Sequence, residues 1–404
     1  MEAHFGGSFN APLLILTTFS TVYSGFTVTG IPSEAYHRGF ISLRWVGATL
    51  VIVAAMLLFY PRLRRLAVER KYRSPNDFIT DRFRSVRLRL LCAACAVVPL
   101  LIYITAQTVS FAAMVSGLTL QVIPKWASMA SFAAVTLALE KLGGMNSVVL
   151  TDAVQSLVMI GAFMLVPWVL GADFGFLPRI AAPDCPSLTL VSRSTASIDA
   201  PPAACSLGPD PASPTGPECV PAGCIAAVRP EFYQYPSQAD QASILWFFVN
   251  MLAAALQPHM IQRAYIAASD RALKVVMVAM LVAPFLAQPP GIVIGLTRAA
   301  FEPAWPEVER NSTAFSAVSD ELMAKGTFEY VLVTVMTCST MAAIMSTADS
   351  ALMGASSVVS IDIFKGSLAP SASKERLVQV GEINSFLMVV AAVFLGLNLS
   401  VSQF

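Results

Sequence analysis

Charge and histidine are scarce in this sequence. Only 13% of its 404 residues are charged, three are histidine, and the formal net charge is +1. Soluble domains carry about 25% charged residues, and nucleic-acid binders carry a marked basic excess. The composition therefore excludes a disordered chain, a nucleic-acid partner and most cytosolic enzymes. The chain is instead 56% hydrophobic, with a mean hydropathy of +0.66, which indicates an integral membrane protein.

Apolar runs long enough to cross a bilayer recur along the chain. A spanning helix needs about 20 apolar residues. The sequence therefore predicts an all-α membrane protein of about nine transmembrane helices. The residues before the first run have no basic n-region and no clear cleavage site, so we expect that run to stay as a helix rather than be removed as a signal peptide. The nine runs are residues 10–30, 42–60, 89–117, 126–140, 147–170, 242–257, 274–297, 327–349 and 377–400.

The distribution of basic residues predicts the orientation. Loop 61–89 holds ten Lys and Arg against three acids. Short basic loops face the cytoplasm, so we expect a cytoplasmic N-terminus and, for a multi-pass protein of this kind, the plasma membrane. The long polar stretch at residues 171–241 then lies outside the cell.

Four of the seven cysteines gather in this external stretch. Cysteines on the oxidising side of a membrane predict two disulfides, with three possible pairings. A zinc site is the alternative, but the spacing is irregular and the stretch holds no histidine. The four are Cys185, Cys205, Cys219 and Cys224. The other three, Cys92, Cys95 and Cys338, lie in apolar runs and are predicted to be core residues. Asn311, in an Asn-Ser-Thr motif of another external loop, is a glycosylation candidate.

Two apolar runs are interrupted by Gly and Pro. The first contains Ser24-Gly25 and Gly30-Ile31-Pro32, and the sixth ends in Gln257-Pro258-His259. Lipid cannot satisfy the backbone groups that a break frees, so breaks occur where they line a cavity or are buried in protein. Matching breaks in two halves point to a transporter with inverted repeats and a midplane site. The alternative is that Gly and Pro are simply frequent in membrane helices.

The eighth run carries a cluster of neutral oxygens. Ser346 and Thr347 place two hydroxyls side by side, and the carbonyl of Ala343 lies on the same helical face as Ser346. Hard alkali cations prefer such oxygens, and a broken partner helix can add free carbonyls. The alternative is that both hydroxyls bond back to the preceding turn or across a helix interface.

Two acids lie inside apolar runs, where a charge at the helix centre costs about 2.5–3.5 kcal/mol. We expect Asp152 and Asp349 near the cytoplasmic ends of their helices, where this cost is smaller. Asp152 is either part of a cation exit path or an acid favoured by the helix dipole. For Asp349 we expect a supporting role, in which it polarises the hydroxyl cluster or pairs with a loop arginine.

Several motifs, in this order, resemble the sodium:solute symporter family, which includes sodium-coupled sugar, proline, pantothenate and monocarboxylate carriers. The likeness covers nearly the whole chain except the cysteine-containing stretch. The matching segments are residues 23–26, 30–32, 35–40, 103–107, 142–145, 151–155, 258–263, 346–350 and 362–365.

The resemblance implies a leucine-transporter-like fold of five plus five inverted helices. Residues 1–170 would form the first repeat, 171–241 the extracellular loop, and 242–404 a second repeat with only four helices. It also implies a sodium ion between the first and eighth core helices. Its ligands would be the carbonyls of Ser20, Tyr23 and Ala343 and the hydroxyls of Ser346 and Thr347. Against the family pattern, a helix before the first core helix and one after the ninth are missing, which is expected of a truncated gene model, a divergent short member or a non-transporting remnant.

The same resemblance implies a substrate pocket at the two breaks and the third helix. Sugar carriers have an aromatic gate at the position of Ala253, and proline carriers have aromatics at Asn250 and Ala254, so neither sugar nor proline is predicted. Three consecutive alanines leave space, or serve only for helix packing. The pocket residues would be Ser24, Phe26, Thr27, Tyr103, Gln107, Asn250, Ala253, Ala254 and Gln257.

The main functional prediction is sodium-coupled symport of a small polar organic solute by alternating access. Its requirements are Na⁺, the solute and a lipid bilayer. A non-transporting solute sensor, a symporter remnant and a structural membrane protein are the alternatives. The three histidines, His4, His37 and His259, are not arranged with a nucleophile or metal ligands, so we do not predict an enzyme.

Overall fold

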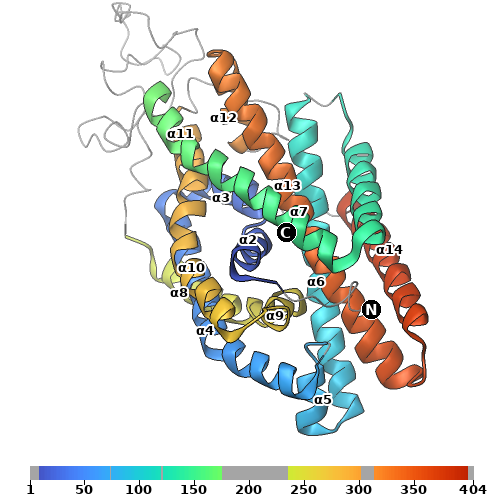
Figure 1. Cartoon of the computed structure of the whole chain (residues 1–404). Helices are drawn as coiled ribbons and strands as arrows, with labels where there is room; N and C mark the ends of the chain where they lie inside the picture. Colours follow the sequence, from blue (N-terminus) through green and yellow to red (C-terminus); the bar gives the residue numbers. More distant parts are fainter. Residues whose placement is uncertain (1–8, 73, 120–121, 175–234, 302–313, 399–404) are drawn as a thin grey trace, which may run out of the picture.

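The computed structural model describes residues 9–72, 74–119, 122–174, 235–301 and 314–398. The four cysteines predicted to form disulfides and Asn311 lie outside these residues, as does the side chain of Phe26. The described chain is built of helices (Figure 1), which confirms the predicted all-α class. In chain order they are α2 (Ala11–Val22), α3 (Gly25–Arg38), η1 (Gly39–Leu43), α4 (Arg44–Arg70), α5 (Asp77–Phe83), α6 (Val86–Leu118), α7 (Lys125–Phe174), α8 (Gln238–Ala254), α9 (Pro258–Tyr265), α10 (Asp270–Ala287), α11 (Pro289–Phe301), α12 (Ala314–Met323), α13 (Thr327–Ser357), η4 (Val358–Leu368) and α14 (Lys374–Asn398).

The first predicted helix is broken between α2 and α3. Tyr23 has an extended backbone (φ −97°, ψ 95°) that ends α2, and α3 begins at Gly25. A Cβ on Gly25 would lie 1.9 Å from Cγ1 of Ile344 in α13, so only glycine fits this close approach. The break at Ser24-Gly25 is therefore confirmed. The second predicted interruption is wrong, because α3 continues through Gly30 to Pro32.

The sixth predicted helix is also broken, as expected. The axes of α8 and α9 differ by 48°, and Gln257 has an extended backbone (φ −63°, ψ 146°) at the start of α9. Pro258 occupies the first turn of α9, where its missing N–H and fixed φ are favourable. The two breaks thus interrupt two helices far apart in the sequence.

The number of spans differs from the prediction. Among the described residues, six helices are long and apolar enough to cross a membrane, or seven if the bent pair α8–α9 counts as one span. The predicted total of nine is not confirmed. Helix α2 has only 12 residues, and runs 126–140 and 147–170 are joined in the 50-residue α7, which turns sharply in Figure 1.

Helix α13 also extends beyond its predicted end at residue 349. It runs to Ser357 and continues as η4 to Leu368. Asp349 therefore lies inside a continuous helix, and its expected position near a helix end is wrong. Two of the apolar-run cysteines, Cys95 and Cys338, are exposed, so they are not core residues; a small apolar thiol suits a lipid-facing surface as well as an interior.

The short helix α2 lies in the middle of the bundle (Figure 1) and packs against α7, α9, α10 and α13. Six of its twelve residues are buried, and four of these six carry hydroxyls. A polar stripe on the innermost helix needs partners from its neighbours, because lipid and apolar side chains offer none. This requirement locates the candidate site.

Candidate functional site

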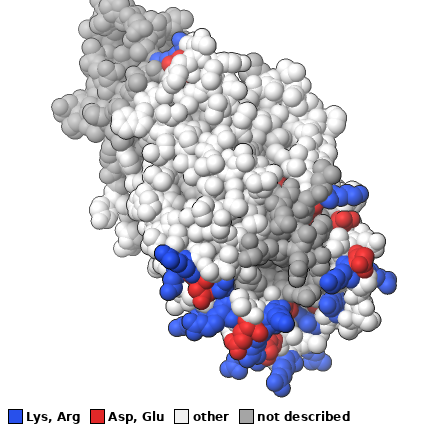
Figure 2. Space-filling view, viewed as in Figure 1, with Lys and Arg blue, Asp and Glu red and all other residues white. Residues whose placement is uncertain are grey.

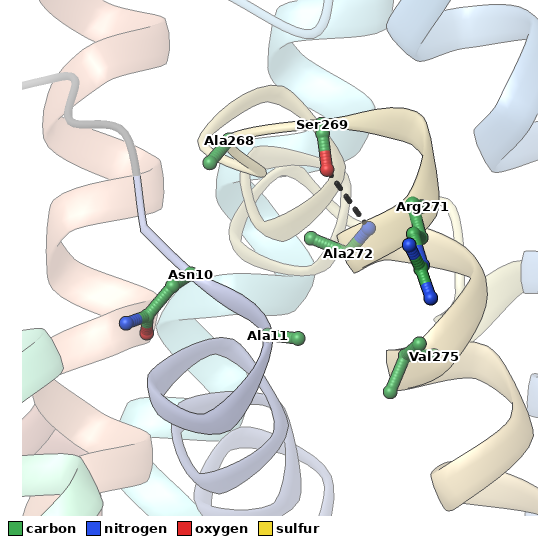
Figure 3. A pocket seen from close by; sticks show the side chains of 7 residues that line it. All are labelled: Asn10, Ala11, Ala268, Ser269, Arg271, Ala272 and Val275. Atoms are coloured by element: carbon green, nitrogen blue, oxygen red, sulfur yellow. Dashed lines mark hydrogen bonds between the residues drawn. The ribbon is translucent and has the colours of Figure 1, made fainter.

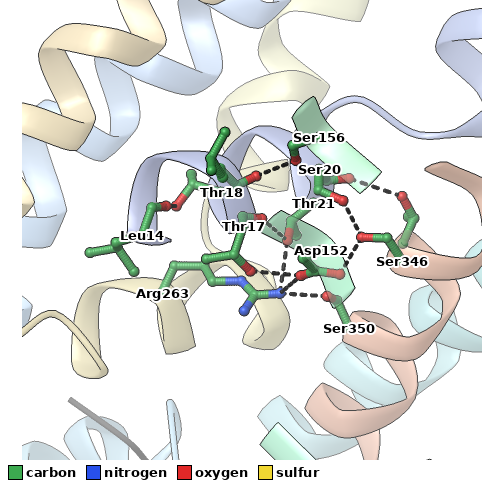
Figure 4. A network of polar contacts seen from close by, with 12 residues as sticks. Leu14, Thr17, Thr18, Ser20, Thr21, Asp152, Ser156, Arg263, Ser346 and Ser350 are labelled. Atoms are coloured by element: carbon green, nitrogen blue, oxygen red, sulfur yellow. Dashed lines mark hydrogen bonds and ion pairs between the residues drawn. The ribbon is translucent and has the colours of Figure 1, made fainter. Parts of the chain in front are cut away.

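The polar centre of the molecule is the Asp152 carboxylate in α7 (Figure 4). Asp152 is fully buried. Its Oδ2 accepts a hydrogen bond from Thr17 Oγ1 at 2.6 Å, and its Oδ1 accepts one from Ser346 Oγ at 2.5 Å. The Arg263 guanidinium in α9 forms an ion pair with Oδ2 at 3.2 Å. Three helices other than its own therefore converge on this carboxylate.

Arg263 links the same helices from the other side of the carboxylate. Its Nη2 donates to Thr21 Oγ1 at 2.8 Å and to Ser350 Oγ at 2.5 Å as well as to Asp152. Only 3% of Arg263 is exposed, so the pair is desolvated and neither charge has water as a substitute partner. In the part of the chain that the structure describes, Nε and Nη1 of Arg263 have no hydrogen-bond partner.

Helical periodicity explains why these side chains meet. Thr17 and Thr21 are four residues apart in α2, and Ser346 and Ser350 are four apart in α13, so each pair lies on one helical face. A further hydrogen bond, from Ser156 Oγ in α7 to the carbonyl of Leu16 at 2.6 Å, holds α2 against α7. The elements are thus fixed by polar contacts on both sides of Asp152.

The predicted oxygen cluster lies beside this centre. Thr347 Oγ1 donates to the carbonyl of Ala343 at 2.9 Å and to that of Ser20 at 3.3 Å, and the hydroxyls of Ser20 and Ser346 are in contact. Four of the five predicted sodium ligands are therefore together between α2 and α13. Tyr23, the fifth, is the buried residue at which α2 ends.

The donor set suits a hard monovalent cation. It combines carbonyl and hydroxyl oxygens, which such ions prefer, and Ser346 connects it directly to the Asp152 carboxylate. Ser20 belongs to the last turn of α2, where backbone carbonyls lack intrahelical partners. The residues present therefore fit a sodium ion.

Asp349 is the second buried acid of this region. Only 2% of it is exposed, and among the described residues its Oδ1 has no hydrogen-bond partner. It lies on α13 between the oxygen cluster and Ser350. Its predicted pairing with a loop arginine does not appear among the ion pairs of the described residues.

The predicted substrate residues fall into two groups. In the first, Tyr103 of α6 is hydrogen-bonded to Ser24 at the α2–α3 break and stacks on His259 of α9 with ring centroids 6.0 Å apart. Gln107 lies one turn further along α6 and is buried with its Oε1 unpartnered within the described chain, and Thr27 is also buried. These residues lie beside the breaks, and their role in a substrate pocket stays a prediction.

The second group lies on α8 and is more open. Asn250 and Ala253 are exposed, whereas Ala254 and Gln257 are half-buried. Asn250 Nδ2 donates to the carbonyl of Trp246 in its own helix at 3.0 Å. The structure therefore keeps the first two of these side chains on the exposed face of α8.

Sequence reasoning missed Thr17, Thr21, Ser350 and above all Arg263. The signal was present, because an acid inside a membrane helix is expected to pair with a basic group, and Arg263 is the one arginine of α9, which has no lysine. The sequence leaves Asp152 between a cation exit path and an acid favoured by the helix dipole, and does not pair it with this arginine, because the two residues are 111 positions apart. Thr17, Thr21 and Ser350 could be identified only after this ion pair was known, because their hydroxyls bind its two members.

A small cavity of about 270 Å³ lies away from this centre, between the starts of α2 and α10 (Figure 3). Asn10 and Ser269 cap the two helices there, and Ser269 Oγ accepts from the N–H of Ala272 at 3.0 Å. None of the predicted site residues lines it. Its lining residues are Asn10, Ala11, Ala268, Ser269, Arg271, Ala272 and Val275.

Paired helix breaks around buried hydroxyls and a carboxylate define the construction of an ion-coupled membrane transporter. Comparison with known proteins agrees. The chain belongs to the sodium:solute symporter family, whose model matches residues 6–403.

Two known proteins are similar to this chain in sequence over different lengths. The human sodium/iodide cotransporter is 32% identical over 158 residues, which cover 37% of this chain and 23% of that protein. The osmoregulated proline transporter OpuE of Bacillus subtilis (strain 168) is 24% identical over 387 residues, or 93% of this chain and 68% of OpuE. This chain thus spans less than a quarter of the first relative and about two thirds of the second.

A solved structure shares the fold. It is a Na⁺-coupled sialic acid symporter in a substrate-bound, outward-open state, with a TM-score of 0.71 over 98% of this chain and 76% of that one. The sequence identity is 14%, so this likeness concerns the fold alone.

Proposed function

We propose that this chain carries out sodium-coupled symport of a small polar organic solute by alternating access. The observation that carries the proposal is the meeting of the Ser20 and Ala343 carbonyls with the Ser346 and Thr347 hydroxyls next to Asp152. Membership of the sodium:solute symporter family supports it. So does the role of sodium in the relatives, a sodium/iodide cotransporter and a Na⁺-coupled sialic acid symporter.

In this proposal sodium joins α2 and α13, which meet at the Ser20 hydroxyl and carbonyl. An ion between α2 and α13 replaces the direct Ser20–Ser346 contact with electrostatic attraction to both helices. Ser346 can then turn its oxygen lone pairs to the ion while its O–H still donates to Asp152. The same rearrangement would fix the end of α2 and so the break at Ser24, where Tyr103 is held.

The domain plan and orientation complete the proposal. Residues 1–170 and 242–404 form the two inverted repeats of a leucine-transporter-like fold, the N-terminus is cytoplasmic, and the membrane is the plasma membrane. One sodium ion crossing 100 mV yields about 2.3 kcal/mol, and a tenfold gradient adds about 1.4 kcal/mol. A one-to-one symporter could therefore concentrate a neutral solute several hundredfold.

Uptake into vesicles tests the function directly. The protein is reconstituted and offered a pooled panel of labelled amino acids, monocarboxylates, vitamins, urea, nucleosides, polyols and iodide, with sodium or choline outside. We expect accumulation of at least one compound only with sodium. Equal uptake in sodium and choline by correctly inserted protein would contradict symport.

The sodium site has its own test in the double variant Ser346→Ala/Thr347→Ala. This variant removes two hydroxyl ligands of the proposed ion. A contact of hydrogen-bond strength contributes about 1 kcal/mol, so we expect the sodium concentration for half-maximal uptake to rise about tenfold or more. The matched control is Ser339→Ala/Thr340→Ala, an adjacent buried pair in α13 whose hydroxyls donate to the carbonyls of Val335 and Met336 in their own helix. An equal effect of both pairs would refute the assignment.

A further inference from the structure

Charged side chains gather at one end of the molecule, and the rest of the visible surface is nearly free of them (Figure 2). At this end α4 ends, α5 crosses over and α6 begins. Apart from Arg70, which pairs with Asp81, the exposed cations of this region form what we name the basic corner. They are Arg62, Arg65, Lys71, Arg82, Arg84 and Arg87.

The basic corner has more positive charge than its acids can neutralise. None of its six cations forms an ion pair within the described residues. Asp81 is already engaged, because Arg70 pairs with it at 2.5 Å and the Tyr72 hydroxyl donates to it at 2.6 Å. The hydrogen bond from Tyr72, followed by the charge of Arg70, lowers the pKa of Asp81. The other two acids of this end are Glu69 and Asp77. Three acids thus stand against the six cations and Arg70, and this end keeps a net positive charge.

Apolar side chains stand among these cations. Phe83, between Arg82 and Arg84, is 57% exposed, and Val86, next to Arg87, is 51% exposed. Exposing an aromatic ring to water is unfavourable. At a membrane interface the ring can enter the lipid while neighbouring cations contact the headgroups. Phe83 is the last residue of α5 and Val86 is the first residue of the membrane-spanning α6. Both therefore lie where the chain enters the span, at headgroup depth.

We propose that the basic corner is a binding surface for anionic phospholipid headgroups of the adjacent leaflet. The six cations contact the phosphates, and Phe83 enters the acyl region beside them. The general bias of Lys and Arg toward the cytoplasmic side of membrane proteins concerns charge alone and does not by itself indicate lipid binding. The exposed aromatic at the centre of the cluster and the absence of acid partners among the described residues are the features that point to a lipid.

The test uses tryptophan fluorescence at the corner. The full chain carrying Phe83→Trp is reconstituted into vesicles in which either phosphatidylglycerol or phosphatidylcholine carries bromine, and the parent protein gives the background from native tryptophans. In the same background, Arg82→Gln/Arg84→Gln/Arg87→Gln weakens the corner. The control, Lys274→Gln/Lys374→Gln/Arg376→Gln, makes the same change of net charge at exposed residues outside it.

Each Lys or Arg near an anionic surface strengthens binding about fivefold. We therefore expect brominated phosphatidylglycerol to quench the introduced tryptophan more than the choline lipid does, and the corner variant to lower that preference by at least about tenfold, while the control keeps it. High salt should reduce it further. Equal quenching by both lipids would overturn the proposal. An equal loss of preference in both triple variants would also overturn it, because net charge alone would then explain the effect. Relief of quenching by free glycerol phosphate would indicate that the site binds a soluble anion instead.

Discussion

At the scale of single residues, the centre of the protein depends on one buried ion pair. Asp152 and Arg263 are almost fully buried, and each also contacts hydroxyls of α2 and α13. A buried pair adds little stability compared with apolar residues, but loss of one partner leaves a charge without compensation. The pair therefore fixes the arrangement of four helices more than it increases their stability.

Because of this asymmetry, Arg263→Met should be strongly destabilising. We expect a loss of about 3–5 kcal/mol in unfolding free energy, because Asp152 stays buried without its cation. The double variant Asp152→Asn/Arg263→Met should recover much of this loss. Thermal unfolding in detergent measures both.

The control is Arg70→Met, which breaks the exposed pair with Asp81 and should change stability by about 1 kcal/mol or less. If Arg263→Met were no worse than Arg70→Met, or if the double variant were less stable than the single one, the uncompensated-charge explanation would fail.

Residue-level prediction succeeded where chemistry is local in the sequence. The adjacent hydroxyls of Ser346 and Thr347 and the carbonyl three to four residues before them are readable from one helix. The contact of Ser346 with Asp152 is not, because 194 residues separate them and only the fold brings α7 to α13.

At the scale of elements, close helix contacts explain the break between α2 and α3. Gly25 lets α3 begin directly against Ile344 of α13. Gly295 does the same for α11, since a Cβ there would lie 2.2 Å from the carbonyl oxygen of Pro32. Helix α11 therefore packs closely against α3 at Pro32.

Gly25→Ala should therefore destabilise the protein by about 1–3 kcal/mol, the usual range for overpacking. Adding Ile344→Ala removes the atoms that the new methyl meets and should restore part of the loss. In the control, Gly161→Ala in α7, the new Cβ meets nothing within 4 Å, so helix propensity predicts a gain of about 0.5–1 kcal/mol. Loss of stability in the control, or no rescue by Ile344→Ala, would contradict the steric explanation.

Element boundaries were the least accurate part of the sequence prediction. Hydropathy placed the apolar runs, yet it ended the eighth run at residue 349, whereas buried polar residues such as Ser356, Ser357 and Asp362 extend the helix into the protein. A hydropathy scale treats these polar residues as if they faced water. It takes no account of hydrogen bonds to residues distant in the sequence, which allow polar side chains to be buried.

At the scale of the whole molecule, a buried clasp joins the α4–α5 connection to η4. Asp362 Oδ2 accepts from Ser74 Oγ at 2.5 Å and from Asn76 Nδ2 at 3.0 Å, and all three residues are buried. Nearby, Arg89 donates to the carbonyl of Gly366. The charged end of the molecule is thus held to the end of the α13–η4 helix.

Asp362→Ala should release this clasp, because it leaves two buried donors without an acceptor at about 1–3 kcal/mol each. Trypsin sites beside the connection, Lys71 at its start and Arg82 in α5, should then be cleaved about tenfold faster or more in the native protein, since proteolysis follows the open population. Ser360→Ala, which removes a buried η4 hydroxyl that donates to the carbonyl of Ser356 in the same continuous helix, should leave the rate unchanged. Equal rates in all three proteins would show that the clasp is not what closes this end.

The length of α2 has an electrical consequence. Twelve residues of helix are about 18 Å long, against a hydrocarbon thickness of about 30 Å, and α2 ends inside the molecule. An ion that reaches its last carbonyls has therefore crossed only part of the membrane's potential drop. The fraction of protein with an ion at that position would therefore depend on voltage even before any conformational change. Presteady-state charge movement would measure this dependence.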